Sequence, residues 1–264
     1  MLFKTSDELN LYYELIGNPK SKNYILFLNG ISQSTVAWNL ILPAFTENYR
    51  IILCDFIFQG QSDKKGDVRS FDQHAADIYG LINFLKIDKI TPIGISYGSL
   101  VAQHFALNYP EKVNKLVLLS TFAHKTPYYN AIEYSWERTL DAGGYALMLD
   151  VMLPMVLGKN YFEHPLVPID TLRSMRQITN NDPDALKKLM KATKQRGDYR
   201  EKLKKIKCPT LIVHGENDTL LLINMGREVA ESISGSKFEI IKGVGHTLNL
   251  EAAPQITKLI TEFI

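Results

Sequence analysis

The sequence predicts an α/β protein with a mostly parallel central sheet, helices on both faces and a helical insertion. Apolar runs of strand length alternate with segments of helical spacing, a pattern typical of a parallel sheet covered by helices. Between about residues 121 and 207 the alternation stops, and only helical patterns are seen. The chain of 264 residues is long enough for one large core, so one domain with an insertion fits better than two domains.

The elements follow one another along the chain in a regular order. Before the insertion we expect strands over 9–16, 24–28, 50–55, 89–93 and 115–120, and helices over 36–45, 71–85 and 99–107. After it we expect strands over 210–214 and 237–241, and helices over 222–232 and from about 249 onward. The core is therefore predicted over residues 1–120 and 208–264. Residues 121–207 are predicted to form a lid over the carboxyl ends of the strands, where ligands bind in open α/β sheets.

The composition, with 45% apolar and 22% charged residues, is ordinary for a soluble globular protein. The formal charge is +2, from 30 basic and 28 acidic residues, so neither nucleic acid nor an anionic membrane is indicated as a partner. Cys54 and Cys208 are the two cysteines, which suits free thiols in a reducing compartment. The sequence shows neither a signal peptide nor an apolar run long enough to span a membrane. We therefore expect a cytoplasmic protein.

One short motif indicates nucleophilic catalysis. Gly94-Ile95-Ser96-Tyr97-Gly98 lies between a predicted strand and a predicted helix, the setting in which Gly-x-Ser-x-Gly forms a nucleophile elbow. The two glycines are needed because a side chain at either position would collide with the neighbouring strand or helix. The motif alone occurs by chance in about one chain in ten of this length, so it also fits an idle serine on a tight turn.

An acid and a base follow the serine in an order that supports catalysis. Asp218 lies in the loop after the strand at 210–214, and His246 lies in the loop after the strand at 237–241. A serine nucleophile needs a base and a third group that orients the base, and in one known layout they occur in the order serine, acid, histidine. We therefore predict Ser96, Asp218 and His246 as the catalytic residues.

Other residues compete for these roles. A single loop aspartate is usually a turn or cap residue, and a single histidine usually packs in the core or lies at the surface. Glu216 is the alternative acid, and His104 and His124 are poorer candidates for the base. The remaining histidines, His74, His164 and His214, are interpreted as packing or surface residues.

Backbone N–H groups would stabilise the oxyanion of an acyl-transfer reaction. One donor is the N–H of Tyr97, directly after the nucleophile, and the other is the N–H of Ile31, after the sharp turn that Gly30 allows. The sequence has no spacing typical of a metal site and no dinucleotide fingerprint, so we expect no metal and no cofactor.

From about residue 9 to its end the chain resembles the α/β-hydrolase superfamily. The elbow, the acid and the base carry the resemblance, together with Asp55-Phe56-Ile57-Phe58-Gln59-Gly60-Gln61-Ser62. This segment is similar to the family's Asp-x-x-Gly-x-Gly-x-Ser loop, with Phe58 in place of the first glycine. The resemblance implies the α/β-hydrolase fold, with the helical lid inserted after the sixth strand, and a serine hydrolase activity.

A second resemblance is to a smaller branch of the superfamily. Most members have His-Gly at the oxyanion turn, where this chain has Asn29-Gly30. Asn-Gly there and Phe58-Gln59-Gly60-Gln61-Ser62 are similar to acyltransferases that use 3-hydroxyacyl thioesters on acyl carrier protein or coenzyme A. Those enzymes make rhamnolipid precursors and polyester monomers. This branch tends to have Ser-Trp-Gly-Gly at the elbow, whereas the chain has Ser96-Tyr97-Gly98-Ser99.

These observations predict a serine hydrolase that cleaves a carboxylic ester or thioester of a small to medium aliphatic acyl group. The alternative is an acyltransferase in lipid or biosurfactant precursor synthesis, which would take its acyl donor from acyl carrier protein or coenzyme A. A non-catalytic binding protein and a carbon–carbon hydrolase also stay open. For substrate binding we predict Asn29 and three residues of the aromatic and Met-rich insertion, Tyr128, Trp136 and Met152, although such residues also pack lid helices onto a sheet.

Overall fold

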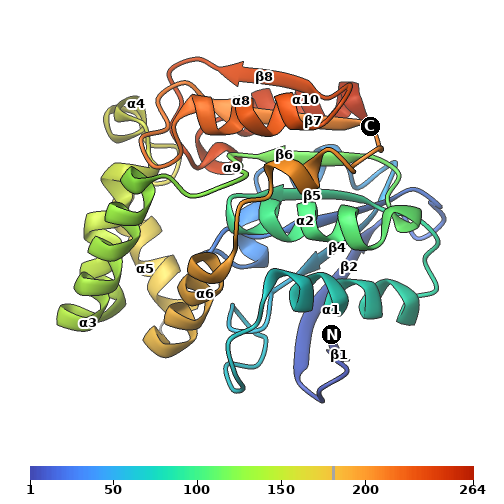
Figure 1. Cartoon of the computed structure of the whole chain (residues 1–264), viewed down its shortest axis with the longest axis horizontal. Helices are drawn as coiled ribbons and strands as arrows, with labels where there is room; N and C mark the ends of the chain where they lie inside the picture. The colour runs from blue at the N-terminus through green and yellow to red at the C-terminus, as the bar shows by residue number, and fades with distance from the viewer. Residues whose placement is uncertain (180–181) are drawn as a thin grey trace.

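The computed structural model describes residues 1–179 and 182–264, and an eight-stranded sheet runs through its centre (Figure 1). The strands lie in the order β1-β2-β4-β3-β5-β6-β7-β8. The β1–β2 and β2–β4 pairs are antiparallel, and the pairs from β4 to β8 are parallel. The strands are β1 (Leu2–Lys4), β2 (Asn10–Gly17), β3 (Tyr24–Leu28), β4 (Arg50–Cys54), β5 (Thr91–Ile95), β6 (Leu116–Leu119), β7 (Thr210–Gly215) and β8 (Lys237–Ile241). The expected mostly parallel sheet is confirmed.

Helices cover both faces of this sheet, and each face has its own apolar core. Helices α1 (Phe71–Phe84), α2 (Tyr97–Asn108) and α8 (Ile223–Ser232) lie on one face (Figure 1). The other face carries α9 (Leu248–Glu251) and α10 (Ala253–Phe263). Within β3, Leu26 and Leu28 join the first core while Ile25 and Phe27 join the second. This alternation follows from the two-residue period of a strand.

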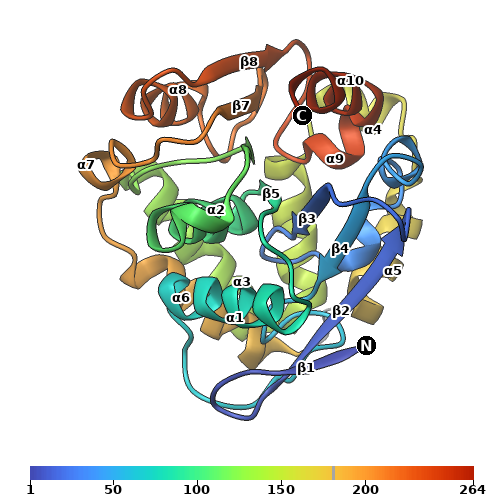
Figure 2. The same cartoon turned by 90° about the vertical axis from the view of Figure 1, so that its right-hand side faces the viewer.

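Five helices lie between β6 and β7. They are α3 (Pro127–Val156), α4 (Lys159–Glu163), α5 (Ile169–Thr179), α6 (Pro183–Gln195) and α7 (Arg200–Leu203). The described residues between 121 and 207 contain no strand, as expected. Helices α3, α5 and α6 stand on the left of the sheet in Figure 1. Figure 2 is turned by 90°, so that the right-hand side of Figure 1 faces the viewer, and α3 and α6 then lie behind the sheet. No helix in the described part of the chain is both long and apolar enough to cross a bilayer.

Helix α1 shows how local sequence sets an element boundary. Ser70 Oγ accepts a hydrogen bond from the Gln73 N–H at 3.2 Å, and Gln73 Oε1 accepts one from the Ser70 N–H at 2.8 Å. This reciprocal capping box satisfies two N–H groups that the first helical turn leaves unpaired. The helix therefore begins one residue after Ser70, at the expected position.

Two expectations about local structure differ from the structure, and one strand was not predicted. Residues 36–45 form no α-helix but two short 3₁₀ turns, η1 (Thr35–Trp38) and η2 (Leu42–Ala44), because Pro43 lacks the N–H that a helix interior requires. The short edge strand β1 was not predicted. The helix expected from residue 249 is divided at Ala252 into α9 and α10, and Pro254 lies in the first turn of α10.

The loop after β4 is a compact hydrogen-bonded unit around the Asp55 carboxylate. Asp55 Oδ1 accepts from the Thr35 N–H at 2.8 Å, and its Oδ2 accepts from the Gln61 N–H at 2.9 Å. Gly60 has φ +42°, and a Cβ there would lie 2.0 Å from Asp55 Oδ2, so no other residue fits without displacement. Phe58, where the related loops have glycine, adopts φ +82°, which is strained backbone for an aromatic residue.

His74 of α1 makes the stability of the fold sensitive to pH. Its side chain is fully buried against the rings of Phe56 and Tyr97, and within the described chain neither ring nitrogen has a hydrogen-bond partner. Burial, followed by the charge of Arg69, lowers the pKa of His74 to about 3. The unfolded chain, with an ordinary histidine pKa near 6.5, therefore takes up a proton at a higher pH than the folded chain does.

We expect this histidine to destabilise the fold as pH falls. The contribution of neutral His74 to the free energy of unfolding is fully present above about pH 6.5 and is lost progressively as the pH falls toward 3. Between pH 7 and pH 5 the loss is up to about 2 kcal/mol. Urea unfolding of wild type and His74→Phe at pH 7, 6 and 5 measures this dependence, with exposed His164→Gln as the control. His74→Phe should show the smaller fall; equal falls in all three proteins would contradict the explanation.

Candidate active site

Ser96 lies on a strained turn between β5 and α2. Its backbone has φ +52° and ψ −116°, and its N–H donates to Leu119 O at 2.9 Å. A Cβ on Gly94 would lie 2.3 Å from Gly98 O, and a Cβ on Gly98 would lie 2.1 Å from Leu28 O. Both glycines therefore allow the close approach between strand, turn and helix that the sequence predicted.

The structure brings His246 and Asp218 together from two loops. His246 Nδ1 lies 2.8 Å from Asp218 Oδ2, and both side chains are buried. Asp218 Oδ1 accepts from the N–H groups of Leu220 at 3.0 Å and Leu221 at 2.8 Å. Because an ionised carboxylate only accepts hydrogen bonds, the hydrogen of a neutral His246 ring is on Nδ1, and Nε2 is left as a proton acceptor.

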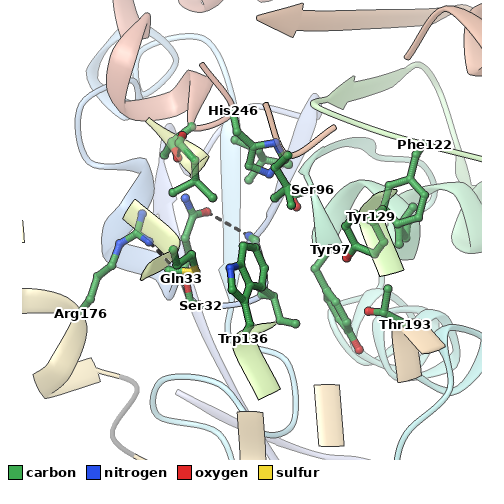
Figure 3. Close-up of a pocket in the computed structure, with 18 residues that line it drawn as sticks. Ser32, Gln33, Ser96, Tyr97, Phe122, Tyr129, Trp136, Arg176, Thr193 and His246 are labelled. Atoms are coloured by element: carbon green, nitrogen blue, oxygen red, sulfur yellow. Dashed lines mark hydrogen bonds between the residues drawn. The ribbon is translucent and has the colours of Figure 1, made fainter. Parts of the chain in front are cut away.

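Ser96 and His246 line the same pocket, which we call the inner pocket. Figure 3 shows their side chains next to each other. The described residues contain no hydrogen bond between the Ser96 hydroxyl and the His246 ring. In enzymes without substrate this contact is often long and tightens only in the complex.

Two residues of the pocket lining have a backbone N–H without an acceptor among the described residues. Neither the Tyr97 N–H nor the Ile31 N–H donates to any atom of the described residues. Gln59 Nε2 donates to Gly30 O at 2.8 Å. Since Gly30 O and the Ile31 N–H point in opposite directions across one trans peptide, this bond directs the Ile31 N–H away from Gln59.

The inner pocket is mostly apolar and is lined by both the sheet and the insertion. It has a volume of about 550 Å³, part of it open to solvent. Four residues of α3 contribute to it, and Figure 3 shows Trp136 in the middle of the lining. The lining residues are Gly30, Ile31, Ser32, Gln33, Ile95, Ser96, Tyr97, Leu100, Phe122, Tyr129, Trp136, Met152, Val156, Arg176, Thr193, Leu220, His246 and Thr247.

Of the four residues predicted to bind substrate, Trp136 and Met152 line this pocket and the other two do not. The Asn29 side chain is fully buried and is not part of the lining; its Nδ2 donates to Cys54 O at 2.9 Å, and its Oδ1 accepts from Trp38 Nε1 at 2.8 Å. Tyr128 is half exposed at the start of α3. Asn29 therefore ties the loop that follows β3 to the end of β4. Neither Asn29 nor Tyr128 lines the pocket, so the structure does not support a substrate contact for them.

The competing acid and bases lie outside the pocket. Glu216 is exposed and accepts from the Gly243 N–H at 2.9 Å. His104 Nδ1 bonds Asp72 at 2.8 Å on α1, and His124 pairs with Glu228 at 3.0 Å. None of these side chains lines the inner pocket.

His214 lies directly behind the acid. Its Nε2 bonds Leu221 O at 2.6 Å and is 3.4 Å from Asp218 Oδ2. Burial lowers the pKa of His214, which disfavours a charge on its ring. His246 Nδ1, at 2.8 Å, is the nearer partner of the Asp218 carboxylate.

Glu251 connects the histidine loop to the insertion, a role that the sequence analysis missed. Its carboxylate accepts from the N–H groups of Gly245 at 3.0 Å and Thr247 at 3.0 Å, on either side of His246. It also accepts from the Gly158 N–H, between α3 and α4, at 2.7 Å. Burial raises the pKa of Glu251, and the three hydrogen bonds offset only part of this rise. No local pattern predicts this role, because Gly158 is 93 residues away.

Comparison with known proteins gives the same fold. A model of the family described as alpha/beta hydrolase fold matches residues 23–253. The uncharacterised hydrolase YugF of Bacillus subtilis is 25% identical over 98% of this chain and 96% of its own length. A 2-hydroxy-6-oxononadienedioate/2-hydroxy-6-oxononatrienedioate hydrolase of Escherichia coli is 28% identical over 91% of this chain and 86% of its own. A thermophilic esterase structure from Thermogutta terrifontis has a TM-score of 0.88 and 25% identity, covering 99% of this chain and 96% of that one.

The Glu251 contacts predict a positioning role with a kinetic signature. In Glu251→Gln an amide N–H₂ replaces one carboxylate oxygen and faces a backbone N–H, so the loop that carries His246 shifts. We expect kcat for an ester to fall about 10- to 100-fold with little change in KM. The matched control is Glu262→Gln, which changes an exposed residue of α10. A fall in kcat no larger than that of the control would contradict the role, and thermal unfolding of both variants separates it from a loss of folded protein.

Proposed function

The chain belongs to the α/β-hydrolase fold family, and we propose that it is a serine hydrolase that cleaves a carboxylic ester or thioester of a small to medium aliphatic acyl group. One observation carries the proposal. A buried aspartate and histidine bond each other at 2.8 Å, and the histidine shares an apolar pocket with a serine on a nucleophile elbow.

In the first step His246 Nε2 takes the proton of the Ser96 hydroxyl as the oxygen attacks the carbonyl carbon. Asp218 holds the imidazole in the required tautomer and stabilises its positive charge. The N–H groups of Tyr97 and Ile31 bind the oxyanion, and each such donor typically lowers the barrier by about 3 kcal/mol. The tetrahedral intermediate then collapses, the alcohol or thiol leaves with the proton from His246, and the acyl group stays on Ser96.

In the second step water releases the acyl group. His246 takes a proton from the water, the hydroxide oxygen attacks the acyl-serine carbonyl, and the same two N–H groups bind the second oxyanion. Collapse of this intermediate gives the free acid, and His246 returns the proton to Ser96.

The insertion at 121–207 acts in this proposal as the lid of the acyl site. Trp136, Met152 and Val156 reach the pocket from α3, and apolar side chains there favour an aliphatic acyl group. A cover over the acyl-serine would also control which nucleophile reaches it. The acyltransferase alternative uses the same catalytic residues and differs only in that second nucleophile. The three relatives described above are named as hydrolases and an esterase, which favours water.

Hydrolysis of a carbon–carbon bond beside a ketone is the second candidate. It is favoured by the Escherichia coli relative, whose name denotes an oxo-acid substrate. A serine can attack a ketone as it attacks an ester carbonyl, with the same oxyanion donors. The two candidates differ in the leaving atom, which is carbon in one and oxygen or sulfur in the other.

Product analysis tests the proposed function. We would incubate the protein with a chain-length series of acyl and 3-hydroxyacyl thioesters and with p-nitrophenyl esters, using Ser96→Ala as the blank, and identify products by mass spectrometry. Free acids that depend on Ser96 are expected. Dimeric hydroxy-esters would instead establish the acyltransferase, and a Ser96→Ala variant with more than half of the activity would refute the site.

The identity of the acid gives a separate prediction. Asp218→Asn should lower kcat by about 10³- to 10⁴-fold, because the amide favours the wrong tautomer of His246. Glu216→Gln is the matched control, since it changes an acidic side chain of the same loop that accepts one backbone hydrogen bond. Steady-state kinetics of both variants decide between the two acids, and a larger loss for Glu216→Gln would show that the acid is misassigned.

A further inference from the structure

Ser99 connects the nucleophile elbow to the interior of the protein. It follows the elbow directly, at the position where the sequence departs from the Ser-Trp-Gly-Gly pattern, and its side chain is fully buried outside the pocket lining. Ser99 Oγ donates to Ser96 O at 2.5 Å. The N–H groups of Ser99 and Leu100 donate to the same oxygen at 2.9 and 3.2 Å. Of these hydrogen bonds to the carbonyl of the nucleophile, only the one from the hydroxyl depends on the side chain at position 99.

The Ser99 hydroxyl is the last member of a chain of buried hydrogen bonds. Its other partner is Thr121 Oγ1, at 2.8 Å, and Thr121 Oγ1 also lies 2.8 Å from Gln103 Nε2. Gln103 Oε1 in turn lies 2.5 Å from Arg196 Nη2. Ser99, Gln103 and Thr121 are fully buried, and Arg196 is 7% exposed. The chain of hydrogen bonds thus runs from the end of α6, in the insertion, to the elbow.

Each hydrogen bond in this chain points toward the elbow. A guanidinium only donates, so the oxygen of the Gln103 amide faces Arg196 and the amide nitrogen donates to Thr121. A backbone carbonyl only accepts, so the single hydrogen of the Ser99 hydroxyl is directed at Ser96 O. The hydrogen of Thr121 Oγ1 is then left for Ser99 Oγ. Hydrogen bonds aligned in this way polarise one another, by about 10–30% per bond.

The chain of hydrogen bonds begins at a cation. Burial lowers the pKa of Arg196 to about 10, so its guanidinium is still charged at neutral pH. Its other hydrogen bonds in the described chain go to Ala123 O at 2.9 Å and to His104 Nε2 at 3.3 Å, so no carboxylate accepts from it. A charged donor makes a stronger hydrogen bond than a neutral one, and Arg196 therefore polarises the chain at its start.

The other end of the chain acts on the peptide bond that joins Ser96 to Tyr97. In a trans peptide the C=O and the N–H point in opposite directions, so a donor held on Ser96 O fixes the direction of the Tyr97 N–H. Tyr97 lines the inner pocket, and its N–H has no acceptor among the described residues. A hydrogen bond to the carbonyl also draws electron density from the N–H and makes it a stronger donor.

We propose that Ser99 is a positioning residue for the oxyanion donor: its hydroxyl, polarised by the chain that begins at Arg196, orients and strengthens the Tyr97 N–H. The inference rests on the proposed serine hydrolase mechanism and adds the group that prepares one of its two oxyanion donors. Ser99 does not touch the substrate. Its effect is largest in the transition state, because a stronger and better directed N–H matters most when the substrate oxygen carries a negative charge.

Two ketones separate this role from a general effect on the pocket. The carbonyl carbon of 1,1,1-trifluorononan-2-one bonds to the oxygen of an activated serine, the π electrons of the carbonyl form an oxyanion, and His246 takes the serine proton. Nonan-2-one has the same chain but adds to serine only very weakly, so it measures binding in the pocket alone. A change in the Ki of the first ketone without a change in that of the second therefore reports on the oxyanion donors.

Removal of the Ser99 hydroxyl should weaken only the oxyanion adduct. In Ser99→Ala we expect the Ki of the trifluoro ketone to rise about 5- to 30-fold, and kcat for p-nitrophenyl butyrate to fall by a similar factor. KM and the Ki of nonan-2-one should change less than about 2-fold. An unchanged Ki for the trifluoro ketone, or an equal rise for both ketones, would overturn the role of Ser99.

The middle of the chain has its own matched variants. Thr121→Val removes the hydroxyl and should raise the Ki of the trifluoro ketone about 2- to 5-fold, whereas Thr121→Ser keeps the hydroxyl and should stay close to wild type. The control is Thr210→Val, which removes another buried hydroxyl, one that donates to Cys208 O at 3.0 Å. It should lower stability without changing either Ki. A Thr121→Val variant with the same Ki values as Thr210→Val would overturn the part of the chain beyond Ser99.

The cation is tested in the same way. Arg196→Met removes the charge and should raise the Ki of the trifluoro ketone about 2- to 5-fold without raising that of nonan-2-one. Arg200→Met, which changes an exposed arginine of α7, is the control. Equal Ki values in these two variants would overturn the role of Arg196. If Arg196→Met does not fold, Thr121→Val still decides whether the chain acts on the oxyanion.

Failure of the proposed function looks different. In that case wild type hydrolyses no ester in a Ser96-dependent manner, forms no adduct with the trifluoro ketone and does not react with a fluorophosphonate at Ser96.

Discussion

The close approach of helix α2 to strand β3 is the constraint on which the site depends. A side chain on Gly98 would overlap the backbone at Leu28, and one on Gly94 would overlap Gly98. Because neither residue has a Cβ, the start of α2 lies against the end of β3. The loop that follows β3 is thereby placed beside Ser96, so Ile31 and Tyr97 line one pocket from two different elements.

Hydrogen bonds join the insertion at several points to the loops that carry Asp218 and His246. Val156 O accepts from both the N–H and the Oγ1 of Thr247, directly after His246. Met155 O accepts from Thr219 Oγ1, directly after Asp218, and Glu251 joins the histidine loop to the segment after α3. The end of α3 is thus part of the scaffold that positions Asp218 and His246, the proposed acid and base. A rearrangement of the insertion that freed this segment would also disturb the catalytic geometry.

The sequence predicted those parts of the molecule that depend on local pattern and chain order. The strands, the elbow glycines and the adjacent placement of Asp218 and His246 follow from apolar runs and from the order of loops after parallel strands. The predicted helix at 36–45 was wrong, because Pro43 lacks the backbone N–H that an α-helix interior requires although the apolar spacing is helical. The side chains of Glu251 and Arg176 contact residues 93 and 144 positions away along the chain, and the Asn29 side chain is buried and is not part of the pocket lining. Such tertiary contacts leave no local signal.

Reaction with a fluorophosphonate, followed by peptide mass spectrometry, tests most directly whether Ser96 is an activated nucleophile. The account predicts a single phosphonate adduct on the peptide that contains Gly94 to Gly98. The adduct should form within minutes in the folded protein, and it should not form when the protein is unfolded in urea before the reagent is added. An adduct on another residue, or none at all, would contradict it.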